Sequence, residues 1–155
     1  MADKRRAMMP QSWLFILMLF AGVGIPIMAA LNAGLGEHIN NPIAAVTLLA
    51  TVALVSSITI LVVAGKPIDW KQFISAPPLF FVAGILFVFY IGSITHSAPK
   101  IGLGNAVLMV LIGQLVCSVI IDHYGLLGVQ QLSITLRRLA GLGSLAIGFW
   151  LVVIK

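Results

Sequence analysis

Five long stretches without a charged residue constrain this chain more than any other feature of its sequence. They cover residues 7–36, 38–65, 72–99, 101–121 and 139–154, and all are rich in aliphatic side chains. A helix needs roughly 20 mostly apolar residues to cross a hydrocarbon core about 30 Å thick. Each stretch therefore comes close to one membrane crossing, and together they use most of the chain.

The amino-acid composition agrees with this interpretation. Hydrophobic residues make up 61% of the chain and charged residues 8%, whereas soluble domains carry about 25% charged residues. We therefore predict an all-α polytopic membrane protein, a single transmembrane domain over residues 1–155 that has the lipid bilayer as its solvent. Its five helices are expected at about 12–35, 43–64, 79–95, 103–121 and 134–154.

The basic residues predict the orientation of these helices. If the connections alternate between the two sides of the membrane, one side collects seven basic residues and the other collects two. By the positive-inside rule, the N-terminus is cytoplasmic and the C-terminus is outside. The richer side holds Lys4, Arg5, Arg6, Lys66, Lys71, Arg137 and Arg138, and the poorer side holds Lys100 and Lys155.

The run Lys4–Arg6 also resembles the start of a signal peptide. The apolar stretch that follows it is long for the core of such a peptide, and four more stretches come after it. We therefore expect a retained first helix, with a cleaved signal as the alternative.

Several function classes are disfavoured by the sequence. The net charge of +5 comes from scattered basic residues without a basic face or aromatic platform, so no nucleic-acid partner is expected. The three histidines lie in three different connections and Cys117 is the one cysteine, so neither a metal site nor a disulfide is predicted. No nucleophile or acid–base pair converges at one depth, and we predict neither an enzyme nor a cofactor.

Neutral polar residues within the expected helices are the candidates for function, because polar groups in lipid are costly unless they find a partner or water. Gln114 lies near the middle of the fourth helix, where it could bind substrate or form an interhelical hydrogen bond. Pro26 removes one backbone hydrogen bond from the first helix and Asn32 follows it. Kinked helices of this kind line binding sites in transporters, although a passive kink is the alternative.

Three further residues are weaker candidates. Tyr90 in the third helix could offer a hydroxyl to a substrate, or it could simply pack in the core. Asp122 and His123 end the fourth helix on the cytoplasmic side, either as a solvated helix end or as a gate or proton relay. No acidic or basic residue lies in the middle of an expected helix. The chain thus lacks the first-helix carboxylate on which proton-coupled antiporters of the small multidrug resistance kind depend.

Several runs resemble the YdcZ family, a set of short, five-helix inner-membrane exporters in the drug/metabolite transporter superfamily. The resemblance extends over nearly the whole chain, in the same order. One departure is Met28, where family members often have Gln, so the cavity of this chain is expected to be more apolar there. The similar runs are Gly24–Gly36, Gly113–Leu115 with Ser118, Ile121–Gly128 and Arg138–Gly141.

The resemblance implies half of a ten-helix inverted-repeat transporter. A lone five-helix chain would then work as a dimer, by alternating access, to export a small neutral or weakly polar metabolite or drug. Helices one, three and four would line the cavity, with Gln114, Asn32 and Tyr90 as polar anchors and Pro26 as a hinge. Because the seven-to-two charge bias disfavours insertion in both orientations, we expect an oppositely oriented paralogue as the partner, or else a parallel homodimer. The alternative function is a non-transporting accessory subunit of a larger membrane complex.

Overall fold

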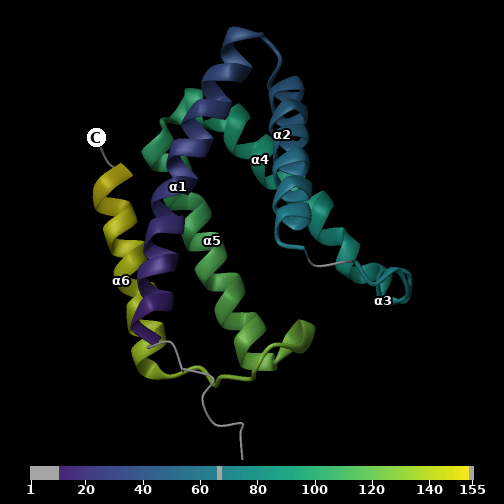
Figure 1. The fold of residues 1–155 in the computed structure, drawn as a ribbon. Coiled ribbons are helices and arrows are strands. Elements are labelled where there is room, and N and C mark those ends of the chain that lie inside the picture. Colours follow the sequence, from purple (N-terminus) through teal and green to yellow (C-terminus); the bar gives the residue numbers. More distant parts are fainter. Residues whose placement is uncertain (1–10, 66–67, 154–155) are drawn as a thin grey trace, which may run out of the picture. The chain divides into compact units, whose positions relative to one another are not determined.

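The computed structural model describes residues 11–65 and 68–153, and every regular element in this part of the chain is helical. Within the described residues, five helical segments are long and apolar enough to cross a membrane (Figure 1). The predicted all-α polytopic fold is therefore confirmed. The basic residues Lys4, Arg5, Arg6, Lys66 and Lys155 lie outside the described residues.

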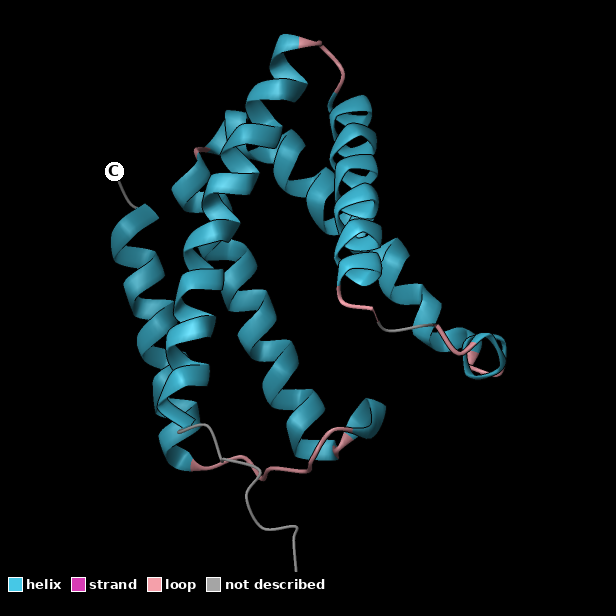
Figure 2. Cartoon of the chain, in the orientation of Figure 1, coloured by secondary structure: helices cyan, strands magenta, loops and turns pink. Residues whose placement is uncertain are grey.

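The helices are joined by short connections, drawn in pink in Figure 2. The four longest helices each have at least 20 residues, which is enough for one crossing. The elements are α1 (Gln11–His38), α2 (Pro42–Val63), α3 (Trp70–Ile74), the 3₁₀ helix η1 (Pro78–Phe81), α4 (Val82–Ile101), α5 (Leu103–Tyr124), the 3₁₀ helix η2 (Leu126–Gly128) and α6 (Leu136–Val153).

A tight turn over residues 39–41 reverses the chain between α1 and α2. Asn40 has a φ of 53°, in the left-handed region that asparagine tolerates better than most residues. The side chain of Asn41 then accepts a hydrogen bond of 3.0 Å from the backbone N–H of Ala44 and so caps α2. Pro42 occupies the first turn of α2, where its missing N–H costs no hydrogen bond. These three residues make α1 and α2 an antiparallel pair.

The connection between α2 and α4 contains the short helix α3, which the sequence did not predict. The Asp69 carboxylate caps it, accepting from the backbone N–H groups of Lys71 at 3.0 Å and Gln72 at 3.3 Å. Phe73 packs edge-on against Trp70 and against Phe81, with ring centroids 5.9 and 5.6 Å apart. An aromatic cluster beside a charged cap is typical of a membrane–water interface.

Three helices run further than expected from the sequence, and the first of them, α1, continues to His38 instead of residue 35. Helix α4 continues to Ile101 instead of residue 95. Pro99 does not end the helix, because it lies in the last turn and removes only one hydrogen bond, the one to the Thr95 carbonyl. Helix α5 continues to Tyr124 and stops at Gly125, whose φ of 60° is the usual helix end of glycine. After η2 the chain is irregular to residue 135, and α6 begins at Leu136.

The described chain divides into two compact units, one up to Thr95 and one from His96 onward. In the first unit α1, α2 and the first part of α4 pack through small and β-branched side chains. Small side chains at a helix interface allow the helices to approach closely. Its buried residues are Ala29, Ala33, Ala45, Val46, Ile91 and Ile94. The single transmembrane domain expected from the sequence stays a prediction.

Gly36 marks the closest approach in the first unit. A Cβ placed on it would lie 3.2 Å from Cγ2 of Thr95, 3.3 Å from Cα of Pro42 and 3.6 Å from Cβ of Ala45. The end of α1, the start of α2 and α4 therefore meet at one point with no room for a larger residue. This contact fixes the depth of α4 relative to α1.

In the second unit, the loop after α5 folds back on the end of that helix. The Asp122 carbonyl accepts from the backbone N–H of Leu132 at 2.8 Å, and the His123 carbonyl accepts from the side chain of Gln131 at 2.9 Å. These bonds satisfy carbonyls that the helix end leaves free. The loop then leads into α6, which packs against α5.

Most large apolar side chains of the spans point outward. Phe15 is 74% exposed and Phe89 is 72% exposed. In water such a surface would aggregate, but in lipid it is the favourable surface, because the backbone polar groups are satisfied within each helix. The outward apolar surface thus follows directly from the uncharged stretches of the sequence.

Candidate functional site

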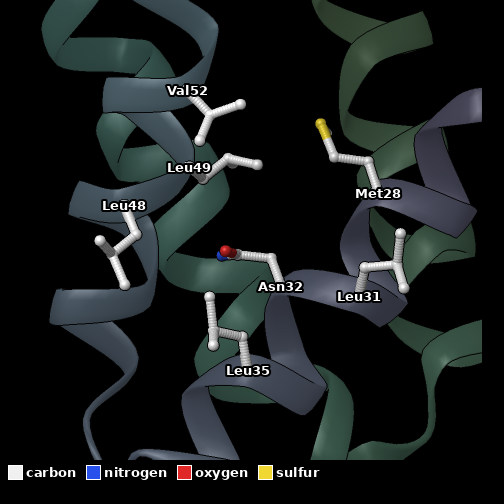
Figure 3. A pocket seen from close by; sticks show the side chains of 7 residues that line it. All are labelled: Met28, Leu31, Asn32, Leu35, Leu48, Leu49 and Val52. Carbon is white, nitrogen blue, oxygen red and sulfur yellow. The ribbon is translucent and has the colours of Figure 1, made fainter.

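An apolar pocket of about 300 Å³ lies between α1 and α2 (Figure 3). It occupies the half of this helix pair that is nearer the turn at residues 39–41. No charged side chain is among the described residues that line it, and Asn32 is the one with a carboxamide. The lining residues are Met28, Leu31, Asn32 and Leu35 of α1, and Leu48, Leu49 and Val52 of α2.

Helical periodicity produces this lining from the sequence. Residues 28, 31, 32 and 35 of α1 are spaced by three or four, so they share one face of the helix. Residues 48, 49 and 52 do the same on α2. Figure 3 shows the Asn32 carboxamide pointing from α1 toward α2, among the aliphatic side chains of both helices.

Asn32 is held by a buried hydrogen bond. Its Nδ2 donates to Oγ1 of Thr95 on α4, with the two atoms 2.6 Å apart. Asn32 is 4% exposed and Thr95 is 2% exposed, so both polar groups lie away from solvent. Burying an amide without a partner costs at least about 1–3 kcal/mol. The pair therefore explains how Asn32 can sit in an apolar site.

Pro26 lies in α1 about 9 Å along the helix axis from Asn32, at 1.5 Å per residue. Helix α1 continues through it, although Pro26 cannot donate a hydrogen bond to the Gly22 carbonyl. Pro26 is half-buried and is not among the residues that line the pocket. It stands between the first half of α1 and the half that carries the pocket.

Tyr90 lies on α4 in the same unit, about one and a half turns before Thr95. Its hydroxyl is buried and has no hydrogen-bond partner among the described residues. A buried hydroxyl without a partner is uncommon and usually indicates a place for a water or a ligand. The described lining of the pocket does not include Tyr90, so the structure does not bring it together with Asn32.

Gln114 lies at the middle of α5, in the second unit, and its side chain is exposed. It makes no hydrogen bond with the described residues, whereas exposed hydroxyls such as those of Thr51 and Ser144 donate to carbonyls of their own helices at 2.8 and 2.9 Å. A glutamine cannot satisfy both its amide donors and its oxygen in this way. The side chain of Gln114 is therefore left without a hydrogen-bond partner among the described residues.

Asp122 and His123 stabilise the end of α5. Oδ2 of Asp122 lies 3.3 Å from Nη1 of Arg138 on α6, and Nδ1 of His123 accepts from the backbone N–H of Ile134 at 3.3 Å. Both charged side chains of the ion pair are about one-third exposed. Both side chains thus contribute to the end of α5, and a role of either as a gate stays a prediction.

The ion pair borders a second pocket of about 310 Å³ between α5 and α6. Apart from the ion pair its lining is mostly aliphatic or small, and the charged groups lie at the end nearer the loop. The lining residues are Leu115, Ser118, Val119, Asp122, Arg138, Gly141, Leu142 and Leu145. Gln114 does not line either of these two pockets.

Comparison with known proteins identifies the family. Residues 13–151 match the family model described as "Putative inner membrane exporter, YdcZ". The chain belongs to the YdcZ family. No curated protein and no solved structure matches it.

Membership in the YdcZ family, together with the five spanning helices, makes this chain a multi-pass inner-membrane protein of the exporter kind. A family of exporters consists of transporters and not of enzymes. The resemblance of the sequence to this family is confirmed over nearly its whole length.

Sequence reasoning missed Thr95, the partner of Asn32. Thr95 marked the end of the expected third helix, and a threonine near a helix end is usually taken as exposed. The signal available was the need of Asn32 for a polar partner at the same depth in another helix. The sequence also predicts Gln114 and Tyr90 in one cavity with Asn32. The residues that line the pocket of this YdcZ-family chain include Asn32 but neither of the other two.

Proposed function

We propose that this YdcZ-family chain is one half of an exporter, and that it binds a small neutral or weakly polar metabolite or drug in the pocket between α1 and α2. The observation that carries the proposal is the buried Asn32 carboxamide in an otherwise apolar pocket of about 300 Å³. Ligand sites are typically apolar with a few placed polar groups. This pocket has that character.

The chemistry of the lining supports the substrate class. A charged ligand would lose its hydration without gaining an opposite charge, because the described lining residues are neutral. Met28, in place of the Gln that family members often carry, leaves Asn32 as the polar anchor. The volume lies at the lower end of the usual range of about 300–1,000 Å³. A small molecule with one or two polar groups fits these conditions best.

Alternating access requires that the pocket open to one side at a time. The close contact of α1, α2 and α4 around Gly36 supports a closed end of the pocket near residues 39–41. With the N-terminal end of α1 in the cytoplasm, this is the outer end. Pro26, between the two halves of α1, is the hinge about which the pocket-bearing half of α1 moves.

The second half of the transporter is a second subunit. The seven-to-two distribution of basic residues supports one orientation of this chain, with the C-terminal end of α6 outside. An oppositely oriented paralogue would restore the inverted repeat. The exposed Gln114 supports a contact between α5 and that subunit, because its amide then finds a hydrogen-bond partner within the membrane.

Native mass spectrometry of the assembly in mild detergent tests the proposal. Bound small molecules from a library of neutral compounds are expected on the wild-type protein and on Asn105→Leu, and to be lost with Asn32→Leu. Asn105→Leu is the matched control, because Asn105, in the first turn of α5, donates to the carbonyl of Ile101 at the end of α4 at 2.7 Å and does not line the pocket. Equal binding by all three proteins contradicts the proposed site. A large unrelated complex without any bound small molecule would instead support the accessory-subunit function.

A further inference from the structure

The amide nitrogen of Asn32 is the donor in the hydrogen bond between Asn32 and Thr95. A carboxamide has two N–H donors on its nitrogen and an acceptor oxygen. In this structure Nδ2 is turned toward α4, where it donates to Oγ1 of Thr95 at 2.6 Å. Oδ1 lies on the other branch of the amide and makes no hydrogen bond with the described residues. Asn32 therefore offers an acceptor to the pocket.

We propose that the pocket selects small apolar molecules that carry a hydrogen-bond donor, a hydroxyl or an N–H group, over isomers that carry only acceptors. Thr95 is the positioning residue that sets this preference, because it holds the donor side of the Asn32 amide away from the pocket. The inference rests on the proposed function, since it concerns the ligand of the same pocket.

The energetic reason is the asymmetry of buried hydrogen bonds. A ligand that fills the pocket displaces water from Oδ1 of Asn32. A hydroxyl on the ligand replaces the lost bond, whereas an ether oxygen leaves Oδ1 unpaired beside another acceptor. The other described lining residues offer no N–H or O–H side-chain group that could bind the ether oxygen. Leaving a buried acceptor unpaired costs about 1–3 kcal/mol, which corresponds to a preference of roughly 5- to 150-fold.

Thr95 acts on the ligand through Asn32. Thr95 is 2% exposed and does not line the pocket. If its hydroxyl is removed, the amide has no partner on α4 and can turn, so that either its oxygen or its nitrogen faces the ligand. The preference for donors should then fall even though Asn32 is unchanged.

The experiment compares two isomers of the same formula, 1-hexanol and methyl pentyl ether, on the full chain in lipid nanodiscs. Binding is followed by NMR through the ¹³C-labelled methyl group of Met28, which lines the pocket and is assigned with Met28→Leu. Titration of the Asn32→Leu variant corrects for the different partition of the two isomers into lipid.

We expect the wild-type protein to bind 1-hexanol roughly 5- to 150-fold more tightly than the ether after this correction. The preference should fall to less than about 3-fold in Thr95→Val and should return in Thr95→Ser. Tighter or equal binding of the ether by the wild-type protein overturns the inference, and so does a preference that survives in Thr95→Val. If neither isomer shifts the Met28 methyl signal, the pocket is not a small-molecule site, and the proposed function fails together with the inference.

Discussion

Replacing Gly36 by alanine tests the packing that holds the pocket in place. Two contributions oppose each other at this position. Alanine is a better helix former than glycine, by up to about 1 kcal/mol. Its Cβ, however, would lie 3.2 Å from Cγ2 of Thr95 and 3.3 Å from Cα of Pro42. The Cα of Pro42 belongs to the backbone next to a tight turn, and the side chain of Thr95 is hydrogen-bonded to Asn32. Neither neighbour can therefore move freely.

Overpacking of this kind typically costs about 1–3 kcal/mol. The net loss of stability for Gly36→Ala is therefore expected between about 0 and 3 kcal/mol. Gly34→Ala is the matched control, because Gly34 lies in the same part of α1 with nothing within 4 Å of an added Cβ. That control should gain up to about 1 kcal/mol. The difference between the two variants isolates the steric contribution, about 1–3 kcal/mol.

The free energy of unfolding is measured by titration with SDS in mixed micelles, with the Met28 methyl signal as a second probe of the pocket. Gly36→Ala should lower the stability and shift that signal, and Gly34→Ala should do neither. If Gly36→Ala stabilises the protein as much as Gly34→Ala, then α1, α2 and α4 do not pack closely around Gly36. The packing argument for the position of Thr95 would then be wrong as well.

Three further predictions concern the orientation, the second subunit and the helix end. A tag after Lys155 should be accessible only from outside the inner membrane, and tags found on both sides in equal amounts would contradict the single orientation. Gln114→Leu should raise the dissociation constant of the dimer by about 3- to 30-fold. Met109→Leu, an exposed position on the same helix, should leave it unchanged, and equal effects would refute the role of the Gln114 amide. Asp122→Asn should lower the free energy of unfolding by no more than about 1 kcal/mol, because the ion pair with Arg138 is about one-third exposed. A loss above about 3 kcal/mol would show that the pair is buried in the assembled protein.

The sequence predicts the spans of this protein well, because a membrane crossing needs only length and the absence of charge. It predicts their ends less well. The ranges expected from the sequence leave Pro99 and Lys100 between two helices, but a proline in the last turn costs only one hydrogen bond, and α4 continues through both residues to Ile101. The short helix α3 depends on the N-terminal cap by Asp69. This is a local interaction, and the segment is too short to show the periodic spacing of apolar residues that predicts a helix.

The site is predictable only in part. Asn32 was found, because an amide in an apolar helix is conspicuous in the sequence. Its partner Thr95 was not, because the depth at which two helices meet depends on close contacts such as that at Gly36. Gln114 lies on α5, in the other unit, and its role in the cavity stays a prediction. Which polar residues share a cavity is a property of helix packing, and a single sequence does not contain it.

The accessibility of the pocket from the two sides of the membrane tests the central claim most directly. A cysteine at Leu49, in a Cys117→Ser background, is placed in the pocket lining, and a cysteine at Val55 on α2 is the lipid-facing control. Both are labelled with a membrane-impermeant maleimide in right-side-out and inside-out vesicles that contain the complete assembly. An alternating-access exporter predicts that Leu49→Cys reacts from both sides and is protected by 1-hexanol, while Val55→Cys reacts from neither. Reaction of Leu49→Cys from one side only, or from neither, would contradict the account.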